Sequence, residues 1–523
     1  MSNQQIDIAN HYHESTKLFY LHLESKPSAY KHYPTQPQYL LPTHLPPLSM
    51  STLAAVAGTA PPDAGATPVD AATLAALCFY AAGRIRKRDF RGAGEVHFRA
   101  AASAGGLYPI ETYVVCGDLP GLAAGVYHFS PPEFALRLLR QGDYRAALAQ
   151  ATGGNRTVMA APVTLVFASV FWRSAWKYRV RSYRYCFWDN GTILANLLAT
   201  AAALGQPARV LMGFVDAQVN HLLGLDGHRE ACTCLVPIGH AAPAIPSAVS
   251  VQVPPLDVET ASGSGETIDY PEIRTLHIAS ALTNPEAVVA WKGQHRQRSQ
   301  PTGETVYALE ATVPAATTLA QTIRQRGSTR RFAREAIALA QLSAILTHAT
   351  TGVPADFLPA QGASLLDIYL IVNAVEGLPA GSYVVSPADR SVSALRLGDF
   401  REEAGHVCFE QALGADASAV VFFMADLGDV LQRFGNRGYG AAQLEAGTVG
   451  GKMYLCAYAM GLGASGLTFY DDEVTAYFAP HADGKSAMFV VALGQTASEN
   501  RVRPFRSRVG MVIDAMSRRD TIG

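Results

Sequence analysis

Apolar and polar residues follow the same succession of patterns twice along this chain. In each half, residues with helical spacing precede a strand and a hairpin, a continuous β-rich apolar run, a long helix apolar nearly all round, and a closing strand. These segments are residues 69–82, 110–116, 163–171, 183–204 and 232–238, and then 339–350, 366–373, 419–424, 439–462 and 487–493. Continuous apolar strands are typical of a central sheet, and all-round apolar helices are typically buried. The pattern predicts an α+β domain, present twice.

The two halves also match residue by residue. An offset of 256 positions brings Lys177, Arg181, Tyr183 and Gly191 onto Arg433, Arg437, Tyr439 and Gly447, Tyr113 onto Tyr369, and Gly125-Val126-Tyr127 onto Gly381-Ser382-Tyr383. A run of this kind without gaps indicates a duplicated domain. We expect the two copies to form an internal pseudo-dimer.

Changes in composition suggest where the domains begin and end. Residues 1–50 are rich in His, Tyr and Pro and have little periodicity, which predicts an irregular arm lying over the surface. The Pro-, Ser- and Gly-rich stretch from about 241 to 275 indicates a connector. We therefore predict domains at residues 51–245 and 315–515, joined by a linker at 246–314.

Composition excludes several functional classes. The chain is 49% hydrophobic and 16% charged, with a net charge of -1, which argues against nucleic acid or an anionic membrane as the main partner. Its seven cysteines are scattered and complete no zinc set, so we expect buried reduced thiols and no metal. The N-terminus lacks a signal-peptide hydrophobic stretch, and the longest apolar run, 158–172, is too short to span a bilayer. We expect a soluble cytoplasmic protein.

Two motifs carry candidate chemistry. In the second copy, Arg326, Ser328 and Arg330 alternate directly after a predicted helix at 317–325 and offer bidentate and neutral donors to an anion. Near the C-terminus, Arg506 and Arg508 offer a second cationic pair. The alternative is a solvated basic turn and a basic tail.

The second motif is a loop of small residues in the first copy. Ser103, Ala104 and Gly105 precede a predicted strand, and their small size lets a planar ligand approach the backbone. Ser103 could then hydrogen-bond the edge of a heterocycle. The alternative is a loop that is small because it turns tightly.

The repeat favours the ligand-binding interpretation of both motifs, because each copy has lost the motif that the other keeps. Ser103 and Gly105 fall opposite Pro359 and Gln361. Matching Gly327 with Gly58 places Ala57, Thr59 and Pro61 opposite Arg326, Ser328 and Arg330. A complete site therefore needs the arginines of the second copy and the loop of the first.

These motifs resemble a known family. The run RGSTRRF resembles the R-x-S-x-R opening of the flavin-dependent nitroreductase superfamily, and SAGGLYPIETY resembles its SagB-type branch, which includes the ThcOx thiazoline and oxazoline oxidases and McbC-like dehydrogenases. Residues 13–17 with Tyr30-Lys31, and residues 176–184, fit the same branch. The resemblance implies two tandem nitroreductase-like domains, each with a mixed central sheet wrapped by helices.

The resemblance also implies one FMN per chain, held between the copies. Arg326 and Ser328 would hold phosphate and ribityl oxygens, Arg330 would face the flavin N1/O2 edge, and Arg506 with Arg508 would complete the phosphate site. Ser103, Ala104 and Gly105 would come from the other domain. Gly466, Leu467 and Thr468 match a segment near the flavin N5 edge, although a glutamate common in reductases is Thr468 here.

A Lys-Tyr pair is the signature of the azoline oxidases, and Lys177-Tyr178 matches it. Lys177 would take a proton from the substrate, with its pKa depressed by nearby arginines or desolvation, and Tyr178 would position the substrate or relay the proton. The second copy has Arg433-Phe434, which cannot abstract a proton. The alternative role for Lys177 is to pair with a phosphate or carboxylate.

The leading hypothesis is an FMN-dependent dehydrogenase that oxidises thiazoline or oxazoline rings of a peptide, with the basic stretch 173–184 receiving an acidic leader peptide or carrier. Other members of a biosynthetic complex are expected partners. A second hypothesis is an FMN oxidoreductase that desaturates another small molecule or reduces nitro or quinone compounds with NAD(P)H. A third is a non-catalytic docking protein that has kept the fold.

Overall fold

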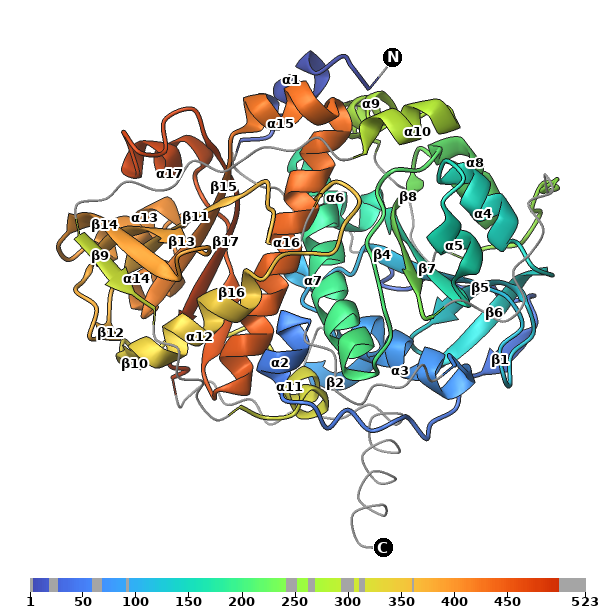
Figure 1. Cartoon of the computed structure of the whole chain (residues 1–523), viewed down its shortest axis with the longest axis horizontal. Helices are drawn as coiled ribbons and strands as arrows, with labels where there is room; N and C mark the ends of the chain where they lie inside the picture. Colours follow the sequence, from blue (N-terminus) through green and yellow to red (C-terminus); the bar gives the residue numbers. More distant parts are fainter. Residues whose placement is uncertain are drawn as a thin grey trace, which may run out of the picture.

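Two α+β domains face each other across a pair of long central helices, α7 (Ser182–Ala203) and α16 (Asn436–Ala459) (Figure 1). The computed structural model describes residues 3–17, 27–58, 68–90, 94–240, 252–261, 269–292, 305–309, 316–359 and 362–497. The predicted α+β class and the tandem arrangement are confirmed.

The first domain is built on a six-stranded sheet in the order β1-β6-β5-β4-β7-β8. Its strands are β1 (Gln38–Leu40), β4 (Ile110–Cys116), β5 (Gly125–Ser130), β6 (Ala135–Gln141), β7 (Val163–Val170) and β8 (Glu230–Ile238). The second domain has a seven-stranded sheet in the order β16-β17-β15-β11-β13-β14-β9. Its strands are β9 (Thr305–Ala308), β11 (Asp367–Val372), β13 (Gly381–Ser386), β14 (Ser391–Leu397), β15 (Ala419–Ala425), β16 (Gly463–Gly466) and β17 (Ser486–Gly494).

The register of the sheets repeats along with the sequence. Tyr113 pairs with Val166 in the first sheet, and Tyr369 pairs with Phe422 in the second, so both partners move by the same offset. Every strand pair that the structure describes in these two sheets is antiparallel, which corrects the expectation of mixed sheets. The order of patterns along the chain does not fix strand direction, because only the connections in space decide it.

Shorter helices cover the sheets and connect the strands (Figure 1). In the first half they are α2 (Thr52–Ala57), α3 (Ala71–Ala82), α4 (Arg145–Ala151), α5 (Arg156–Ala160), α6 (Phe171–Tyr178) and α8 (Asp216–Leu223), with 3-10 turns η1 (Ala104–Gly106) and η2 (Arg179–Arg181). In the second half they are α11 (Leu319–Gln325), α12 (Leu339–Ala349), α13 (Arg401–Val407), α14 (Ala412–Asp416), α15 (Leu427–Phe434) and α17 (Asp471–Tyr477). Two small sheets complete the fold, the hairpin β2 (Arg84–Phe90) with β3 (Gly94–Arg99), and the parallel pair β10 (Ile337–Ala338) with β12 (Val375–Glu376).

Equivalent glycines meet where α7 crosses α16. A Cβ atom at Gly191 would lie 2.5 Å from the carbonyl carbon of Gly447, and one at Gly447 would lie 2.7 Å from Cα of Trp188. Only glycine permits this approach of the two backbones. A residue that contacts its own equivalent marks a two-fold axis, so the pseudo-dimer axis passes through this crossing.

Each domain also supplies an arginine to a carboxylate of the other. Arg181 Nη1 donates to Asp471 Oδ2 at 2.7 Å, and Arg437, its equivalent, pairs with Asp216 at 2.9 Å. Asp216 and Asp471 each begin a helix, α8 and α17. Contacts exchanged in both directions are expected for an interface with two-fold symmetry. The reciprocal pairs confirm the predicted internal pseudo-dimer.

The N-terminal segment is more ordered than the sequence predicted. It contains α1 (Asp7–Ser15) and β1, and β1 extends the first sheet. The ring of Tyr12, 1% exposed, packs edge-on against Tyr183 at 5.4 Å and Tyr439 at 5.7 Å, a pair related by the repeat. The expectation of an irregular surface arm is therefore wrong, because its aromatic side chain finds partners only where the two domains meet.

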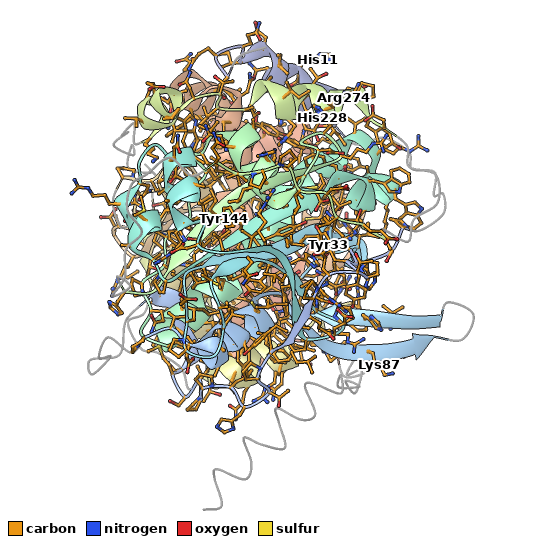
Figure 2. The ribbon with its side chains drawn as sticks, turned by 90° about the vertical axis from the view of Figure 1, so that its right-hand side faces the viewer. His11, Tyr33, Lys87, Tyr144, His228 and Arg274 are labelled. Carbon is orange, nitrogen blue, oxygen red and sulfur yellow. The ribbon has the colours of Figure 1, made fainter. Side chains whose placement is uncertain are left out.

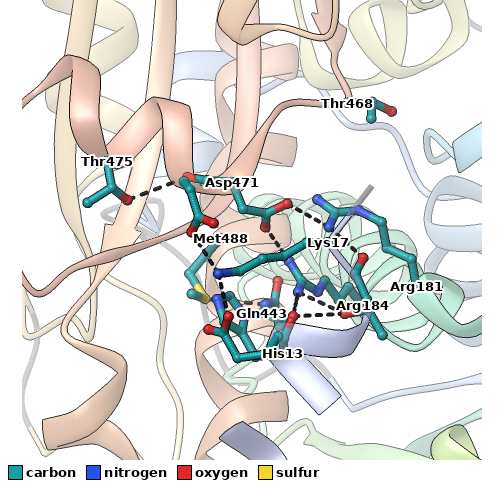
Figure 3. A network of polar contacts seen from close by, with 12 residues as sticks. His13, Lys17, Arg181, Arg184, Gln443, Thr468, Asp471, Thr475 and Met488 are labelled. Atoms are coloured by element: carbon teal, nitrogen blue, oxygen red, sulfur yellow. Dashed lines mark hydrogen bonds and ion pairs between the residues drawn. The ribbon is translucent and has the colours of Figure 1, made fainter. Parts of the chain in front are cut away.

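Polar contacts tie α1 to both domains (Figure 3). Arg184 Nη2 donates to the carbonyl oxygen of His13 at 2.7 Å and to Thr16 Oγ1 at 2.8 Å, while its Nη1 donates to Asp471 at 2.5 Å. Burial, reinforced by Arg184, lowers the pKa of His13 to about 2, so this imidazole stays neutral. The segment around Asp471 is thus fixed from two sides.

The stretch expected as a linker, 246–314, contains regular structure. Helices α9 (Pro271–Ala279) and α10 (Pro285–Trp291) lie beside α1 and α8 (Figure 1), and β9 pairs with β14 at the edge of the second sheet. Pro271 and Pro285 stand at the helix starts, where a missing N–H is tolerated.

Within the described ranges, no helix combines the length and apolar character needed to cross a membrane, and no cluster of His, Cys, Asp or Glu is placed to hold a metal ion. The cysteines are all free and buried, as predicted: Cys78, Cys116, Cys186, Cys232, Cys234, Cys408 and Cys456.

Candidate functional site

The Lys177-Tyr178 pair lies against the small-residue loop of the same domain. Lys177 and Tyr178 end α6, and Gly105 has φ of 63°. A Cβ atom at Gly105 would lie 3.0 Å from Tyr178 Oη and 3.4 Å from Lys177 Nζ. A side chain here would adopt a disfavoured conformation and press on both groups. The structure therefore brings two motifs together that are far apart in the sequence.

Asp189 on α7, which was not among the predicted site residues, holds this loop in place. Its carboxylate accepts hydrogen bonds from Ser103 Oγ at 2.5 Å and from the Ala104 amide at 2.9 Å. Ser103 Oγ in turn accepts from the Tyr108 amide at 2.8 Å. Burial raises the pKa of Asp189 to about 7, although these hydrogen bonds oppose the shift. The Ser103 hydroxyl thus donates to Asp189 of α7, where the sequence predicted a bond to a ligand.

A signal for Asp189 was present in the repeat. The same offset places Glu445 opposite it, and Glu445 Oε2 accepts from the Leu365 amide at 2.9 Å. Both copies thus keep an acidic residue within a buried central helix, and in both it binds the backbone before the second strand of its sheet. A carboxylate repeated in a buried helix is a detectable sign of such a role.

An aromatic side chain of α7 connects the Lys177-Tyr178 pair to the second domain. The rings of Tyr178 and Tyr185 stack with centroids 4.2 Å apart, and Tyr185 Oη lies 3.5 Å from Thr468 Oγ1. Of the two predicted neighbours of Thr468, Gly466 donates its amide to Tyr454 Oη, and Leu467 donates its amide to the Val490 carbonyl at 3.0 Å. The backbone at 466–468 is therefore fixed beside the Tyr178-Tyr185 stack.

Arg326 crosses from the second domain to the backbone that leads into the loop. Its Nε donates to the Ala100 carbonyl at 3.0 Å, and its Nη2 donates to the Arg99 carbonyl at 3.4 Å. Its guanidinium is buried and lies 5.9 Å from the centre of the Tyr454 ring. Arg326 thus joins the two motifs that the repeat combines into one site.

Arg330 lies close enough to Tyr178 for its positive charge to affect the pKa of the phenol. Burial raises the pKa of Tyr178 well above its usual range, Tyr185 and Asp189 add to this, and the positive charge of Arg330 opposes it. Arg330 is exposed and Ser328 is half-buried, and neither has a hydrogen bond or ion pair with the residues described. The predicted Arg506 and Arg508 lie outside the described residues.

In the second copy, the counterparts of Lys177 and Tyr178 have different partners. Arg433, the counterpart of Lys177, pairs with Asp429 at 2.7 Å. The indole of Trp291, from α10, lies 5.5 Å from the ring of Phe434 and donates to its carbonyl at 2.8 Å. The same indole lies 3.4 Å from where a Cβ atom of Gly213 would stand. An aromatic side chain of the chain itself therefore occupies the region that corresponds to the surroundings of Tyr178.

The basic stretch 173–184 is largely buried. Arg173, 3% exposed, is paired with Glu111, and Arg181 and Arg184 are both paired with Asp471. The prediction that this stretch forms a receiving surface for an acidic leader peptide is therefore wrong for these three arginines. Their acidic partners lie far away in the sequence, so the pairing becomes visible only in the fold.

A cavity of about 370 Å³ lies at the opposite end of α6, where Phe171, Arg173 and Ala175 form part of its wall with Ile273 of α9. None of the described site residues lines it. The cavity is a separate space that shares α6 with the Lys177-Tyr178 pair.

Comparison with known proteins agrees with this geometry. Residues 65–240 and 323–495 match the model of the Nitroreductase family. A crystal structure of a nitroreductase-family protein from Anabaena variabilis superposes with a TM-score of 0.73 at 25% identity, covering 94% of this chain and 99% of the other. The tandem arrangement therefore has a solved counterpart along nearly its whole length.

Curated relatives match over shorter segments. The nitroreductase-family protein MJ1384 of Methanocaldococcus jannaschii is 28% identical over 142 residues, 27% of this chain and 70% of that protein. The microcin B17-processing protein McbC of Escherichia coli is 29% identical over 24% of this chain and 49% of its own length. The trifolitoxin-processing protein TfxB of Rhizobium leguminosarum is 32% identical over 30% of this chain and 43% of its own length.

The match thus spans less than half of McbC and of TfxB. The family model, in contrast, covers the core of both domains. With two matched segments that together make up more than half of its length, the chain belongs to the nitroreductase family.

Proposed function

We propose that this chain is an FMN-dependent dehydrogenase that oxidises thiazoline or oxazoline rings of a peptide. The observation that carries the proposal is the contact of Lys177 and Tyr178 with Gly105, in a composite site to which both domains contribute. Similarity to two peptide-processing proteins, McbC and TfxB, supports a peptide substrate.

The donors at the composite site suit FMN. Arg330 and Ser328 offer N–H and O–H groups that no described residue uses. Arg326 has fewer donors left for a ligand, because three of its N–H groups already donate to backbone carbonyls. The arginine motif and the small-residue loop each occur in one copy only, which supports one FMN per chain. When bound, FMN would supply a two-electron acceptor.

The remaining roles in the reaction would belong to side chains of the protein. Oxidation of an azoline ring removes two hydrogens, one as a proton and one together with its electron pair. Lys177 would take the proton, because burial raises the pKa of Tyr178 and keeps its phenol protonated, so the phenol cannot serve as the base. Arg330 would place a positive charge where negative charge develops. Asp189 would hold the loop that positions Lys177 and Tyr178.

The test is anaerobic mixing of the flavin-loaded protein with a model thiazoline peptide. We expect bleaching of the flavin absorbance and loss of two hydrogens from the peptide by mass spectrometry. Lys177→Ala should keep its flavin and lose turnover by roughly 100-fold or more, the contribution of a general base. Arg433→Ala, at the equivalent place in the second copy, is the matched control and should turn over normally. Normal turnover by Lys177→Ala would contradict the base assignment.

Reduction of nitro or quinone compounds with NAD(P)H is the second candidate, and the likeness to MJ1384 and to the Anabaena protein favours it. Rapid oxidation of NAD(P)H by the flavin-loaded protein, without any azoline substrate, would support this reaction over the first.

A further inference from the structure

A basic hairpin of the first domain reaches the arginine motif of the second. Strands β2 and β3 stand out from the body of the molecule, with Lys87 on the projecting part (Figure 2). Near the base of the hairpin, Arg86 Nη2 donates to the carbonyl oxygen of Arg326. It also lies 4.0 Å from where a Cβ atom of Gly327 would stand. The guanidinium of Arg86 is therefore at the start of the RGSTRRF motif.

Arg86 and Arg326 thus lie close together without a described carboxylate between them. In the part of the chain that the structure describes, neither Arg86 nor Arg326 pairs with a carboxylate, and Arg86 Nε is buried without a hydrogen-bond partner. Burial, reinforced by the charge of Arg326, lowers the pKa of Arg86 to about 10. Buried cations are normally compensated by an anion, because removing them from water is costly.

The remaining groups around the two arginines are neutral donors and small residues. Tyr458 Oη lies 3.6 Å from the same Cβ position of Gly327 and 3.2 Å from Thr329 Oγ1. Glycine at 327 leaves room above the backbone, because a Cβ atom there would make only ordinary contacts. Two guanidinium groups with nearby hydroxyls are the donor set that binds a phosphate monoester.

The hairpin occurs only in the copy where the composite site needs it. In the first copy it lies between α3 and the loop of Ser103 to Gly105. In the second copy, the described residues between α12 and β11 contain no strand. The β2–β3 hairpin therefore accompanies the composite site and has no counterpart among the described residues at the equivalent place in the second copy.

We propose that Arg86 binds the phosphate of FMN together with Arg326, so that each domain contributes a cation to the same anion. The proposal rests on the proposed function for the identity of the cofactor. It has a consequence for assembly, since FMN then links the hairpin of the first domain to the motif of the second and favours their docked arrangement by mass action.

The experiment compares two flavins that differ only in the phosphate. The full-length protein, freed of flavin, is titrated with FMN and with riboflavin while flavin fluorescence is followed. Arg86→Ala should weaken FMN binding by roughly 10- to 100-fold, the range for hydrogen bonds to a charged group, and leave riboflavin binding unchanged. Arg88→Ala, exposed and two residues along the same strand, is the matched control and should bind both flavins like the wild type.

Arg86→Lys provides a second variant that keeps the charge, and it should retain part of the preference for FMN over riboflavin. Circular dichroism of each variant checks that it is folded. An unchanged ratio of FMN to riboflavin affinity in both folded Arg86 variants overturns the proposal. A wild-type protein that binds neither flavin overturns the proposed function itself, so the two failures are distinguishable.

Discussion

Asp471→Asn is the substitution whose effect follows most directly from the structure. Asp471 accepts hydrogen bonds from Arg181 at 2.7 Å and Arg184 at 2.5 Å, and its side chain is 2% exposed. The asparagine keeps the shape of the side chain and removes its negative charge. Two buried guanidinium groups of the first domain then lose the anion that compensates them.

The size of the effect follows from two estimates. Breaking a buried ion pair by removing one partner destabilises a protein by about 3–5 kcal/mol. Independently, Arg184 and Arg181 outweigh burial and lower the pKa of Asp471 from 3.8 to about 2, which corresponds to about 2 kcal/mol of favourable interaction with the charged form. If the 523 residues unfold together, an unfolding entropy of about 2.1 cal/mol/K per residue converts 3–5 kcal/mol into a fall in melting temperature of roughly 3–5 °C.

The assay is thermal unfolding of the full chain, followed by circular dichroism at pH 7. Asp216→Asn is the matched variant at the pseudo-symmetric position, where Arg437 keeps hydrogen bonds to the carbonyls of Met212 and Ser280. We expect a smaller fall in melting temperature for Asp216→Asn than for Asp471→Asn. Only Asp471→Asn should also lose flavin, because the segment before Asp471 carries Thr468, a predicted flavin neighbour. A melting temperature of Asp471→Asn within 1 °C of the wild type would refute the reasoning, since ~1 kcal/mol is below the range for a broken buried pair.

The same pair predicts a dependence on pH. The pKa of Asp471 is lower in the folded protein than in the unfolded chain, so its contribution is complete above about pH 4 and is lost as the pH falls toward 2. The difference in melting temperature between wild type and Asp471→Asn should therefore shrink on acidification. A difference that stays constant from pH 7 to the lowest pH at which both proteins fold would exclude this linkage.

Three further outcomes are expected. Gly105→Ala should destabilise the loop by about 1–2 kcal/mol, because the backbone at this position has a positive φ. It should also slow turnover, because the new methyl group would lie 3.0 Å from Tyr178 Oη. Wild-type turnover rates in a kinetic assay would argue against this packing. Asp189→Asn should match the wild type in melting temperature near pH 4 and increasingly exceed it as the pH rises to 7. The pKa of the buried carboxyl is raised from 3.8 to about 7 by folding, so its contribution to stability is complete only below about pH 4 and is lost as the pH rises through 7. Trp291→Ala should destabilise the protein by roughly 3–5 kcal/mol, because it removes a buried indole. It should leave the proposed content of one flavin per chain unchanged, since the first copy lacks the arginine motif. The flavin released by denaturation measures this content, and two flavins per chain would contradict the expectation.

Much of the site was predictable because the duplication supplied an internal comparison. The losses of Ser103 and Gly105 in one copy and of Arg326 and Arg330 in the other point to a composite site from the sequence alone. The fold joins Arg326 to the backbone at Ala100 and brings Gly105 against the Lys177-Tyr178 pair. The assignment of FMN contacts to these residues stays a prediction.

Other parts could not be predicted because they depend on partners distant in the chain. Arg181 and Arg184 were predicted to belong to a stretch that receives an acidic leader peptide or carrier, and only the fold supplies Asp471 as their partner. Tyr12 belonged to a segment without periodicity, and its aromatic neighbours come from both domains. Trp291 lay in a stretch expected to be a linker, yet its indole packs against Phe434, the counterpart of Tyr178.

The sequence by itself determined the duplication, the α+β class and the residues that distinguish one copy from the other, because periodicity and residue type are local properties of the chain. The tertiary structure decided which charges are compensated, which side chains surround Tyr178 and its counterpart Phe434, and where Arg86 and Asp189 lie. Burial and ion pairing arise between segments hundreds of residues apart, so they exist only once the two copies have packed around their common axis.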